Sequence, residues 1–171
     1  GPGATNLITG IATAYMDSIP MVALTGQVAT KLIGKDAFQE VDITGATLPF
    51  TKHSYLIKDG LDIPRVVNEA FHIANTGRPG PVLIDFPMDL LKKEFDYPDE
   101  DEDVNIRGYK LMGKANESQV KKVAEAIKGA KKPVILAGGG VVISDATNEF
   151  RKFVKETDIP VVSTMMGIGI L

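Results

Sequence analysis

The stretch Thr76–Pro87, TGRPGPVLIDFP, contains a helix stop, a rigid turn and a strand in quick succession. Gly77 ends the segment Ile63–Gly77, whose apolar residues recur at helical spacing, and glycine commonly ends a helix. Pro81–Pro87 is a short and almost wholly apolar run, which is typical of a buried strand. The chain therefore passes from a helix to a strand here, and the flanking segments extend this order.

Upstream, the chain alternates between helical and strand patterns. Apolar residues at helical spacing predict a helix from about Ala4 to Asp17. Pro20–Gln27 is a short apolar run of the form taken by a strand buried on both faces, and Thr51–Ile57 is a second strand candidate. The predicted order in residues 1–92 is α-β-β-α-β, with loops on one edge.

Downstream, residues 93–117 lose hydrophobic periodicity and gain charge, which is typical of a solvated linker between domains. Residues 118–171 then follow the order α-β-α-β, which indicates a parallel sheet with crossover helices. We therefore expect an α/β protein with two parallel-sheet domains, the second one cut short. The patterns in the second domain are a helix stripe at Val120, Val123, Ala124 and Ile127, a strand at residues 133–137, a glycine turn before a helix start at Ser144 or Asp145, a helix stripe at Phe150, Phe153 and Val154, and a strand at residues 159–163.

The composition indicates a globular chain and excludes several kinds of site. Hydrophobic residues make up 44% of the chain, enough for a core, and no run approaches the roughly 18 apolar residues of a membrane span. The absence of cysteine excludes disulfides and thiolate chemistry and fits a cytoplasmic protein. The Gly1 start and the apolar end at residues 165–171 lead us to expect a piece of a longer chain.

The charge distribution gives no sign of a nucleic-acid partner. The net charge is −3, and six carboxylates lie between Asp96 and Asp103, so the rest of the chain is only mildly basic and has no basic tract. We interpret the acidic run as solvent-exposed linker, because it lacks the glycine and the spacing of a calcium loop.

Three turns could bind a ligand, and each also has an ordinary structural explanation. Gly1–Asn6, GPGATN, could direct backbone N–H groups of a helix start at a ligand, or form a plain turn and cap. Ala137–Val142, AGGGVV, could bind a phosphate or nucleotide after a strand, or be a tight turn, since it does not match the dinucleotide fingerprint. Arg78 could bind a phosphate or carboxylate, or lie free on the surface.

The two histidines form no catalytic or metal-binding pattern. His72 lies on a predicted helix among apolar neighbours and is expected to be structural. His53 sits beside Lys52 at a strand start, where a ligand role stays open. No HExxH or GxSxG motif is present, which disfavours hydrolases of those types, and we assign no metal ligand.

Five segments of the chain are distinctive when taken together: residues 1–28, residues 32–43 (LIGKDAFQEVDI), residues 51–57 (TKHSYLI), residues 76–87 (TGRPGPVLIDFP) and residues 133–140 (PVILAGGG). They resemble the large, catalytic subunits of the acetolactate synthases, also called acetohydroxyacid synthases, within the thiamine diphosphate-dependent enzymes. The strongest indicators are KDAFQEVDI and TGRPGPVLID at the right separation. The resemblance implies that residues 1–92 are the C-terminal part of a pyrimidine-binding domain, residues 93–117 an acidic linker, and residues 118–171 the N-terminal part of a central, flavin-binding, Rossmann-like domain.

The resemblance also implies an activity and a set of partners. The parent protein would be a transferase of branched-chain amino-acid biosynthesis that decarboxylates pyruvate and joins the product to a second 2-keto acid, using the carbanion chemistry of thiamine diphosphate. It would use Mg²⁺, held by ligands outside this chain, and FAD as a structural cofactor. It would form a homodimer or tetramer with the active site between subunits, and a regulatory small subunit could bind it. No nucleic acid and no membrane is expected as a partner.

The same resemblance implies roles for individual residues. Gln39 would reach the cofactor and the reacting intermediate, and Phe38 would form the adjoining apolar wall that excludes water. The catalytic glutamate of these enzymes would lie upstream of this chain, so Glu40 is not given that role. The other implied contacts are Pro2 and Asn6 with the aminopyrimidine, Ser18, Arg78 and Gly138, Gly139 and Gly140 with the flavin, and Lys52, Ala29 and Met88 with the substrate channel.

Two departures from the family pattern concern the channel. Ala29 stands where many relatives have proline, and Met88 where many have lysine. They leave the reaction class intact but put the channel contacts and the response to inhibitors in question.

Two alternatives stay open at this point. Another thiamine diphosphate carboligase or decarboxylase, such as glyoxylate carboligase, would share most of these motifs. From the residues alone, the chain could also be a non-catalytic nucleotide-binding module. We further expect the isolated 171 residues to be inactive and poorly stable, because half a sheet leaves apolar faces and strand edges exposed.

Overall fold

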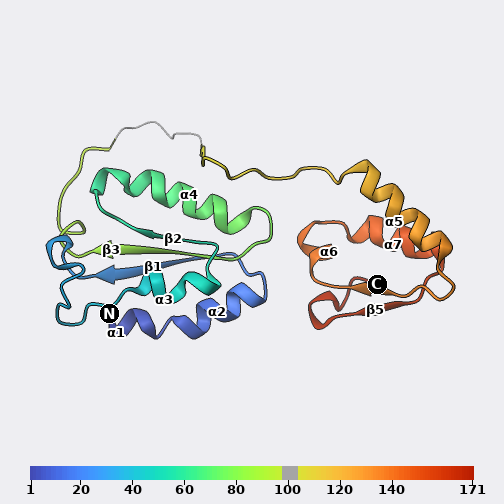
Figure 1. Cartoon of the computed structure of the whole chain (residues 1–171), viewed down its shortest axis with the longest axis horizontal. Coiled ribbons are helices and arrows are strands. Elements are labelled where there is room, and N and C mark those ends of the chain that lie inside the picture. The colour runs from blue at the N-terminus through green and yellow to red at the C-terminus, as the bar shows by residue number, and fades with distance from the viewer. Residues whose placement is uncertain (98–103) are drawn as a thin grey trace. The chain divides into compact units, whose positions relative to one another are not determined.

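The computed structural model describes residues 1–97 and 104–171 and divides into two compact units, Gly1–Met112 and Gly113–Leu171. Both units contain parallel strands and helices, which confirms the predicted α/β class (Figure 1). Residues 98–103, part of the predicted acidic linker at residues 93–117, lie outside the described residues. Within the described ranges, no helix is both long enough and apolar enough to span a membrane.

The first unit is built on a three-stranded parallel sheet in which β3 is the central strand. All seven residues of β3 are buried, so the apolar run that begins at Pro81 occupies the position that such a run favours. Pro81 and Pro87 lack a backbone N–H, and a central strand tolerates them because they stand at its two ends, where the strand ladder needs no N–H. The strands are β1 (Met21–Gln27), β2 (His53–Leu56) and β3 (Pro81–Pro87).

Helices cover both faces of this sheet. Figure 1 shows α4 on one face and α1, α2 and α3 on the other. Pro64 lies in the first turn of α4, where its missing N–H costs nothing, and Gly77 follows the helix with positive φ. The elements are α1 (Pro2–Thr5), α2 (Ile8–Met16), α3 (Ile43–Thr47) and α4 (Ile63–Asn75), with the 3-10 turns η1 (Thr30–Leu32), η2 (Leu48–Phe50) and η3 (Gly60–Asp62).

The alternation of side chains along β3 divides the core into two layers. Val82, Ile84 and Phe86 pack with α4, in a cluster that includes the buried apolar residues of that helix. Leu83 points to the opposite face and packs with Ile11 of α2 and residues of α1 and α3. One strand therefore contributes to both hydrophobic layers of the unit.

β1 differs from the expectation that it is buried on both faces. It is an edge strand in the described structure, and Leu24 is 62% exposed. An apolar run shows that a segment favours burial, but it does not show how many strands flank it. The first predicted helix also differs, because it is divided at Asn6 and Leu7 into α1 and α2.

Part of the segment predicted as a solvated linker packs on the first unit. Phe95 and Tyr109 lie against the α4 layer of the core. The ring of Phe95 occupies the space beside Gly60 where a Cβ would otherwise be, so Gly60 has to lack a side chain. The tyrosine hydroxyl of Tyr97 donates to the carbonyl of Gly60 at 3.2 Å.

The second unit has two parallel strands and a small core. Its buried apolar residues are Ala137, Ile159 and Ile170, and α5 contains no buried residue among those described. The predicted stripe that begins at Val120 does form a helix, but Val120, Val123 and Ala124 are exposed and Ile127 is half-buried. The elements are α5 (Glu117–Gly129), β4 (Ile135–Ala137), α6 (Gly140–Ile143), α7 (Thr147–Thr157), β5 (Val161–Ser163) and the 3-10 turn η4 (Met165–Gly167).

The helix after the glycine turn that follows β4 was predicted to start at Ser144 or Asp145, and this start is wrong. The short helix α6 begins at Gly140, and Ser144 ends it instead of starting a helix. Asp145 has φ of 54°, a left-handed conformation that breaks the helix, and α7 begins only at Thr147. Three glycines in succession indicated a turn, but the backbone already enters a helical turn at the third.

The two layers of the core lead to a prediction about stability. In the 171-residue chain, Leu83→Ala should lower the free energy of unfolding of the first unit by about 3 kcal/mol, because it leaves a cavity against β3. Leu24→Ala, the same change on the exposed side of β1, should cost less than about 1 kcal/mol. Urea unfolding followed by circular dichroism measures both, and equal losses would contradict this description of the core.

Candidate functional site

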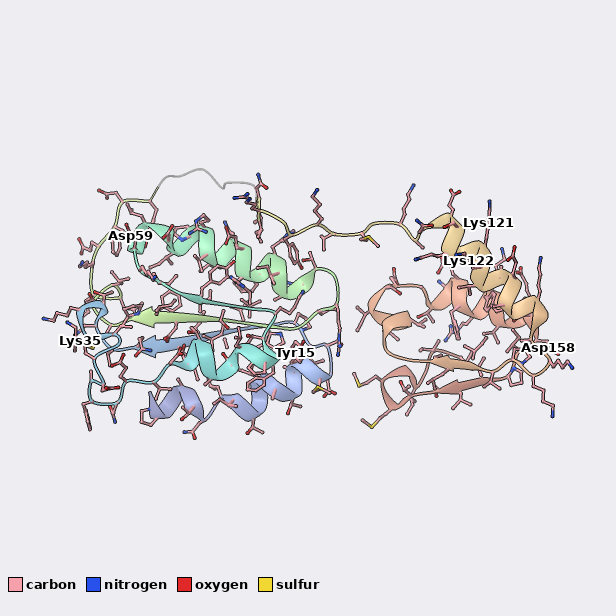
Figure 2. All side chains as sticks on the ribbon, in the orientation of Figure 1. Tyr15, Lys35, Asp59, Lys121, Lys122 and Asp158 are labelled. Carbon is pink, nitrogen blue, oxygen red and sulfur yellow. The ribbon has the colours of Figure 1, made fainter. Side chains whose placement is uncertain are left out.

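The loop of residues 28–42 lies at the carboxyl edge of the first sheet, between β1 and α3. In parallel α/β sheets, ligands bind at this edge, because the loops that follow the strands meet there. Figure 2 shows Lys35 of this loop at one end of the first unit and Tyr15 at the other end. We define residues 28–42 as the edge loop.

Glu40 holds the edge loop in its shape. Its carboxylate accepts hydrogen bonds from the backbone N–H groups of Ala37, at 2.8 Å, and Gly34. These two bonds, that of Ala37 first, hold the pKa of Glu40 below its usual value. Both oxygens of the carboxylate are therefore used within the loop, which gives Glu40 a structural task.

Phe38 and Gln39 are presented to solvent by this loop. The Phe38 side chain is 89% exposed, and Gln39 is exposed with φ of 61°, in the left-handed region. A non-glycine residue in that region is uncommon and persists only where the surrounding structure holds it there. The described residues offer no hydrogen-bond partner to the side-chain amide of Gln39, which leaves both of its polar groups available.

The start of the chain lies against the same loop. Gly1 approaches the carbonyl oxygen of Gln39 so closely that a Cβ on Gly1 would overlap it. Pro2 and Asn6 are exposed at the two ends of the first helical turn. The structure therefore brings the GPGATN segment next to Gln39, two segments that are about 38 positions apart in the chain.

A buried polar cluster, Thr25, Gln27 and Asp85, connects the sheet to the edge loop. Asp85 accepts hydrogen bonds from the Thr25 hydroxyl at 2.7 Å and from Gln27 Nε2 at 2.9 Å. Gln27 Nε2 also donates to the carbonyl of Val41 at 2.7 Å, and Gln27 Oε1 accepts from the N–H of Val28 at 2.8 Å. Burial raises the pKa of Asp85, and the bonds from Thr25 and Gln27 oppose this rise.

The sequence analysis gave these three residues no role, although a signal was present. Asp85 is the only charged residue in β3, where every position is buried. Thr25 and Gln27 are two residues apart on β1 and so point to the same face. A buried strand rarely contains an unpaired carboxylate, so partners on the neighbouring strand were to be expected.

A second polar contact anchors the beginning of the edge loop. Asp89, just after β3, accepts from the backbone N–H of Thr30 at 2.8 Å and from its hydroxyl at 2.6 Å. Ala29 is buried immediately before this contact, and Met88 is exposed beside it. The structure thus places Ala29 and Met88 at the same edge as Phe38 and Gln39.

Lys52 lies at the opposite edge of the sheet from Ala29 and Met88. It precedes β2, and its N–H donates to the carbonyl of Pro81 at the beginning of β3. Seven residues of β3 separate the two edges, or about 20 Å at the usual rise per residue. Within this unit the three predicted channel residues therefore do not lie together.

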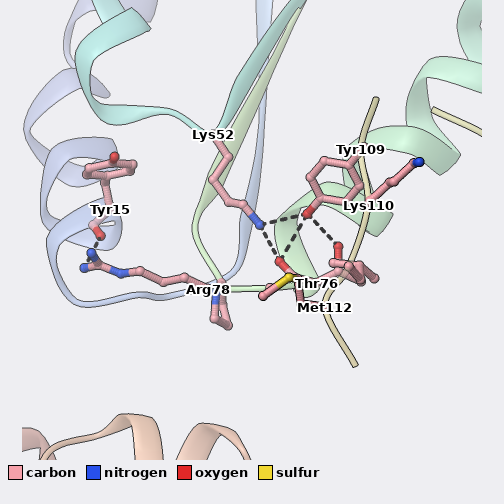
Figure 3. Close-up of a pocket in the computed structure, with 10 residues that line it drawn as sticks. Tyr15, Lys52, Thr76, Arg78, Tyr109, Lys110 and Met112 are labelled. Atoms are coloured by element: carbon pink, nitrogen blue, oxygen red, sulfur yellow. Dashed lines mark hydrogen bonds between the residues drawn. The ribbon is translucent and has the colours of Figure 1, made fainter. Parts of the chain in front are cut away.

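Lys52 instead borders a cavity of about 380 Å³ at the amino edge of the sheet (Figure 3). Its ammonium group donates to the carbonyls of Ile73 and, at 2.6 Å, Thr76, at the end of α4. The Tyr109 hydroxyl lies 2.8 Å from that of Thr76 and also contacts the ammonium group. Tyr109 further packs edge-on against His72, which supports a structural role for this histidine.

Arg78 borders the same cavity and makes contact with Ser18. Its Nε donates to the Ser18 hydroxyl at 2.7 Å, and one terminal nitrogen donates to the carbonyl of Met16 at 3.0 Å. The guanidinium group thus caps the end of α2, where a cation is favoured, and lies 5.9 Å from the ring centre of Tyr15. Ser18 and Arg78, which the resemblance assigns to the flavin, contact each other in this unit, and Arg78 also bonds the end of α2.

Gly138, Gly139 and Gly140 lie in the second unit, after β4. A Cβ on Gly139 would come within 3.1 Å of Met166 Cβ, so close packing inside the unit favours glycine there. A Cβ on Gly140 would meet nothing within 4 Å. In residues 1–97 and 104–171, no group of three or more histidine or acidic side chains could hold a metal ion.

Comparison with known protein families finds two matching domain models. Residues 1–46 match the thiamine pyrophosphate enzyme N-terminal TPP binding domain. Residues 120–171 match the thiamine pyrophosphate enzyme central domain. The first match covers α1, α2, β1, the edge loop and most of α3, and the second covers most of the second unit.

Comparison with characterised proteins finds relatives along the whole chain. An acetolactate synthase large subunit of Buchnera aphidicola from Schizaphis graminum is 51% identical over 99% of this chain. An acetolactate synthase of Mycobacterium bovis is 53% identical over 99% of the chain, and a large subunit of Haemophilus influenzae is 46% identical over the same share. The chain spans 30%, 27% and 30% of the lengths of these three proteins.

The Glu40 contacts give a prediction about pH. Because the folded loop lowers this pKa, the carboxylate stabilises the loop above the pKa of an unfolded glutamate, and this contribution is lost as the pH falls through the lowered value. In an NMR titration, the amide shifts of Gly34 and Ala37 should change with a midpoint below the usual glutamate pKa. Glu40→Gln should abolish that titration, and a midpoint at or above the usual value would contradict the two hydrogen bonds.

The Lys52 contacts give a prediction about the end of α4. Lys52→Met should lower the free energy of unfolding by about 1.5 kcal/mol, because carbonyls at the helix end lose a charged donor. Lys58→Met is the matched control, since Lys58 is exposed on the loop after β2. Thermal unfolding compares the two variants, and an equal effect would show that the capping contacts contribute nothing.

Proposed function

This chain belongs to the thiamine pyrophosphate enzyme family, and from that premise we propose that it is part of the large subunit of an acetolactate synthase. The whole enzyme would decarboxylate pyruvate and transfer the two-carbon product to a second 2-keto acid, in branched-chain amino-acid biosynthesis. Relatives with that name are about half identical along almost the entire chain. The cytoplasm is the proposed location.

The arrangement of the carboxyl edge is the observation that carries this proposal. It places the GPGATN segment beside Gln39 and leaves an exposed aromatic ring and exposed side-chain amides at one end of a parallel sheet. These groups fit an aminopyrimidine, which is flat and has hydrogen-bond donors and acceptors on its rim. When bound, thiamine diphosphate would supply the carbanion chemistry that no side chain of this edge could supply.

The residues of the edge would bind and shield the reacting centre. Pro2 and Asn6 would lie against the pyrimidine, and Gln39 would donate to or accept from the cofactor and substrate. Phe38 would exclude water from the same space, which protects a carbanion from protonation. Its almost complete exposure in a single chain is consistent with an active site that a second subunit closes, as in a homodimer or tetramer.

Other parts of the proposal come from the resemblance and from the relatives. Mg²⁺ would be bound by residues beyond this chain, and a regulatory small subunit could bind the assembled enzyme. FAD would contact Ser18, Arg78 and Gly138–Gly140. Its proposed role is structural, as the resemblance implies.

The test is turnover by the full-length protein that contains this chain. With pyruvate, thiamine diphosphate and Mg²⁺, it should release carbon dioxide and form acetolactate, and omission of thiamine diphosphate should abolish both. Gln39→Asn keeps an amide and tolerates the left-handed backbone but is one carbon shorter, so kcat should fall at least about tenfold. Lys35→Gln, in the same loop, should leave kcat unchanged.

Absence of acetolactate from the wild-type protein under these conditions would refute the function. Equal kcat values for the Gln39 and Lys35 variants would refute the assignment of Gln39 while leaving the function in place.

A further inference from the structure

A buried carboxylate lies at the centre of the first unit, where no step of the proposed reaction uses it. Asp85 is 1% exposed and belongs to β3, the one strand among the described residues in which every residue is buried. Removal of a carboxylate from water is costly, and an apolar side chain would fill the same place at lower cost. Its presence therefore calls for a task that an apolar residue could not perform.

The hydrogen bonds of Asp85 lead to the edge loop through a single side chain. Gln27 Nε2 has two hydrogens, and it donates one to Asp85 and the other to the carbonyl of Val41. Gln27 Oε1 accepts from the N–H of Val28. All three contacts agree on one orientation of the amide, and a flipped amide would place donor against donor at Val28. Asp85 favours this orientation because its oxygen accepts a hydrogen bond from Nε2.

The contacts of Gln27 join the two ends of the edge loop. Val28 is its first residue and Val41 is close to its last, so one amide holds both ends at a fixed separation. Asp89 adds a second anchor at Thr30. Phe38 and Gln39 lie between these anchors, and Gln39 holds a left-handed backbone conformation that needs such support.

We propose that Asp85 is a positioning residue that, through Gln27, fixes the edge loop and thereby places Phe38 and Gln39 at the carboxyl edge of the sheet. This role rests on the proposed function in so far as it concerns turnover. The effect on the order of the loop does not depend on that function. Asp85 itself touches neither substrate nor cofactor in this scheme.

The variants separate positioning from simple stability. Asp85→Leu removes both acceptor oxygens at similar volume, which leaves Gln27 Nε2 without one of its partners. Asp85→Asn keeps an acceptor for Gln27, because its NH₂ group can turn to the Thr25 hydroxyl. Gln27→Met removes the hydrogen bonds that link Asp85 to the edge loop and leaves Asp85 itself in place. Tyr55→Phe is the control, since it removes one partly buried hydrogen bond, of 2.8 Å to Glu69, on β2 away from the edge loop.

The experiment uses the full-length protein saturated with thiamine diphosphate and Mg²⁺. Hydrogen exchange of residues 28–42, kcat, KM for pyruvate and the unfolding temperature are measured for each variant. Asp85→Leu and Gln27→Met should speed exchange in the edge loop and lower kcat by about 100-fold with a smaller change in KM, as expected for misplaced groups. Asp85→Asn should stay within about threefold of wild type.

A double variant tests whether Asp85 acts through Gln27. If it does, Asp85→Leu combined with Gln27→Met should lower kcat no further than Gln27→Met alone, because the link is already broken. Multiplied losses would overturn the connection through Gln27. If Asp85→Leu does not fold, Gln27→Met decides the matter, because it leaves β3 unchanged.

Two results would overturn the proposal as a whole. The first is that Asp85→Leu and Gln27→Met show the same hydrogen exchange in the edge loop and the same kcat as the control Tyr55→Phe. The other is an Asp85→Asn variant as impaired as Asp85→Leu, which would show that charge rather than the acceptor matters. A wild-type protein without acetolactate formation would refute the proposed function only, and exchange in the edge loop would then still test the role of Asp85.

Discussion

Complete burial of β3 is the constraint on which the rest of the first unit depends. Helices cover both faces of this strand, so each of its side chains must be apolar or must find a polar partner inside the protein. β1 and β2 take their register from β3, and its two ends set the positions of both sheet edges. At one end, the backbone N–H of Lys52 donates to the carbonyl of Pro81. At the other end, the backbone N–H of Met88 donates to the carbonyl of Gln27.

The two edges differ in how their polar groups are used. At the amino edge, Lys52 and Arg78 donate to carbonyls at the ends of α4 and α2, so their charges stabilise the fold. At the carboxyl edge, Glu40 and the β1 residue Gln27 bond to the backbone of the edge loop, and the side chains of Gln39 and Phe38 are exposed. This division is what a binding edge needs, since the groups that shape the loop are distinct from the groups that it presents.

Much of the fold could be predicted from the sequence, because β3 and α4 have clear apolar patterns and clear end signals at Gly77 and Pro81. The edge position of β1 could not, since its apolar run does not reveal its neighbours. The resemblance assigned Lys52 to the substrate channel. In the structure, Lys52 directly precedes β2 and therefore lies at the amino edge of the first sheet. The roles of Gln39, Pro2 and Asn6 stay predictions, since they concern a cofactor. Asp85 stands out as a charged residue in a buried strand, but the sequence does not identify its partners, which lie about 60 positions away.

Asp85 also has a consequence for how the chain reaches its fold. Side chains alternate between the two faces of β3, so a shift of one residue against β1 would turn Asp85 from the polar cluster into the apolar layer beneath α4. No acceptor or donor of the cluster would follow it there, and the misaligned sheet would carry an unpaired charge. A strand made only of apolar residues would have no such penalty. The single carboxylate therefore disfavours pairings of β3 that are shifted by one residue against β1.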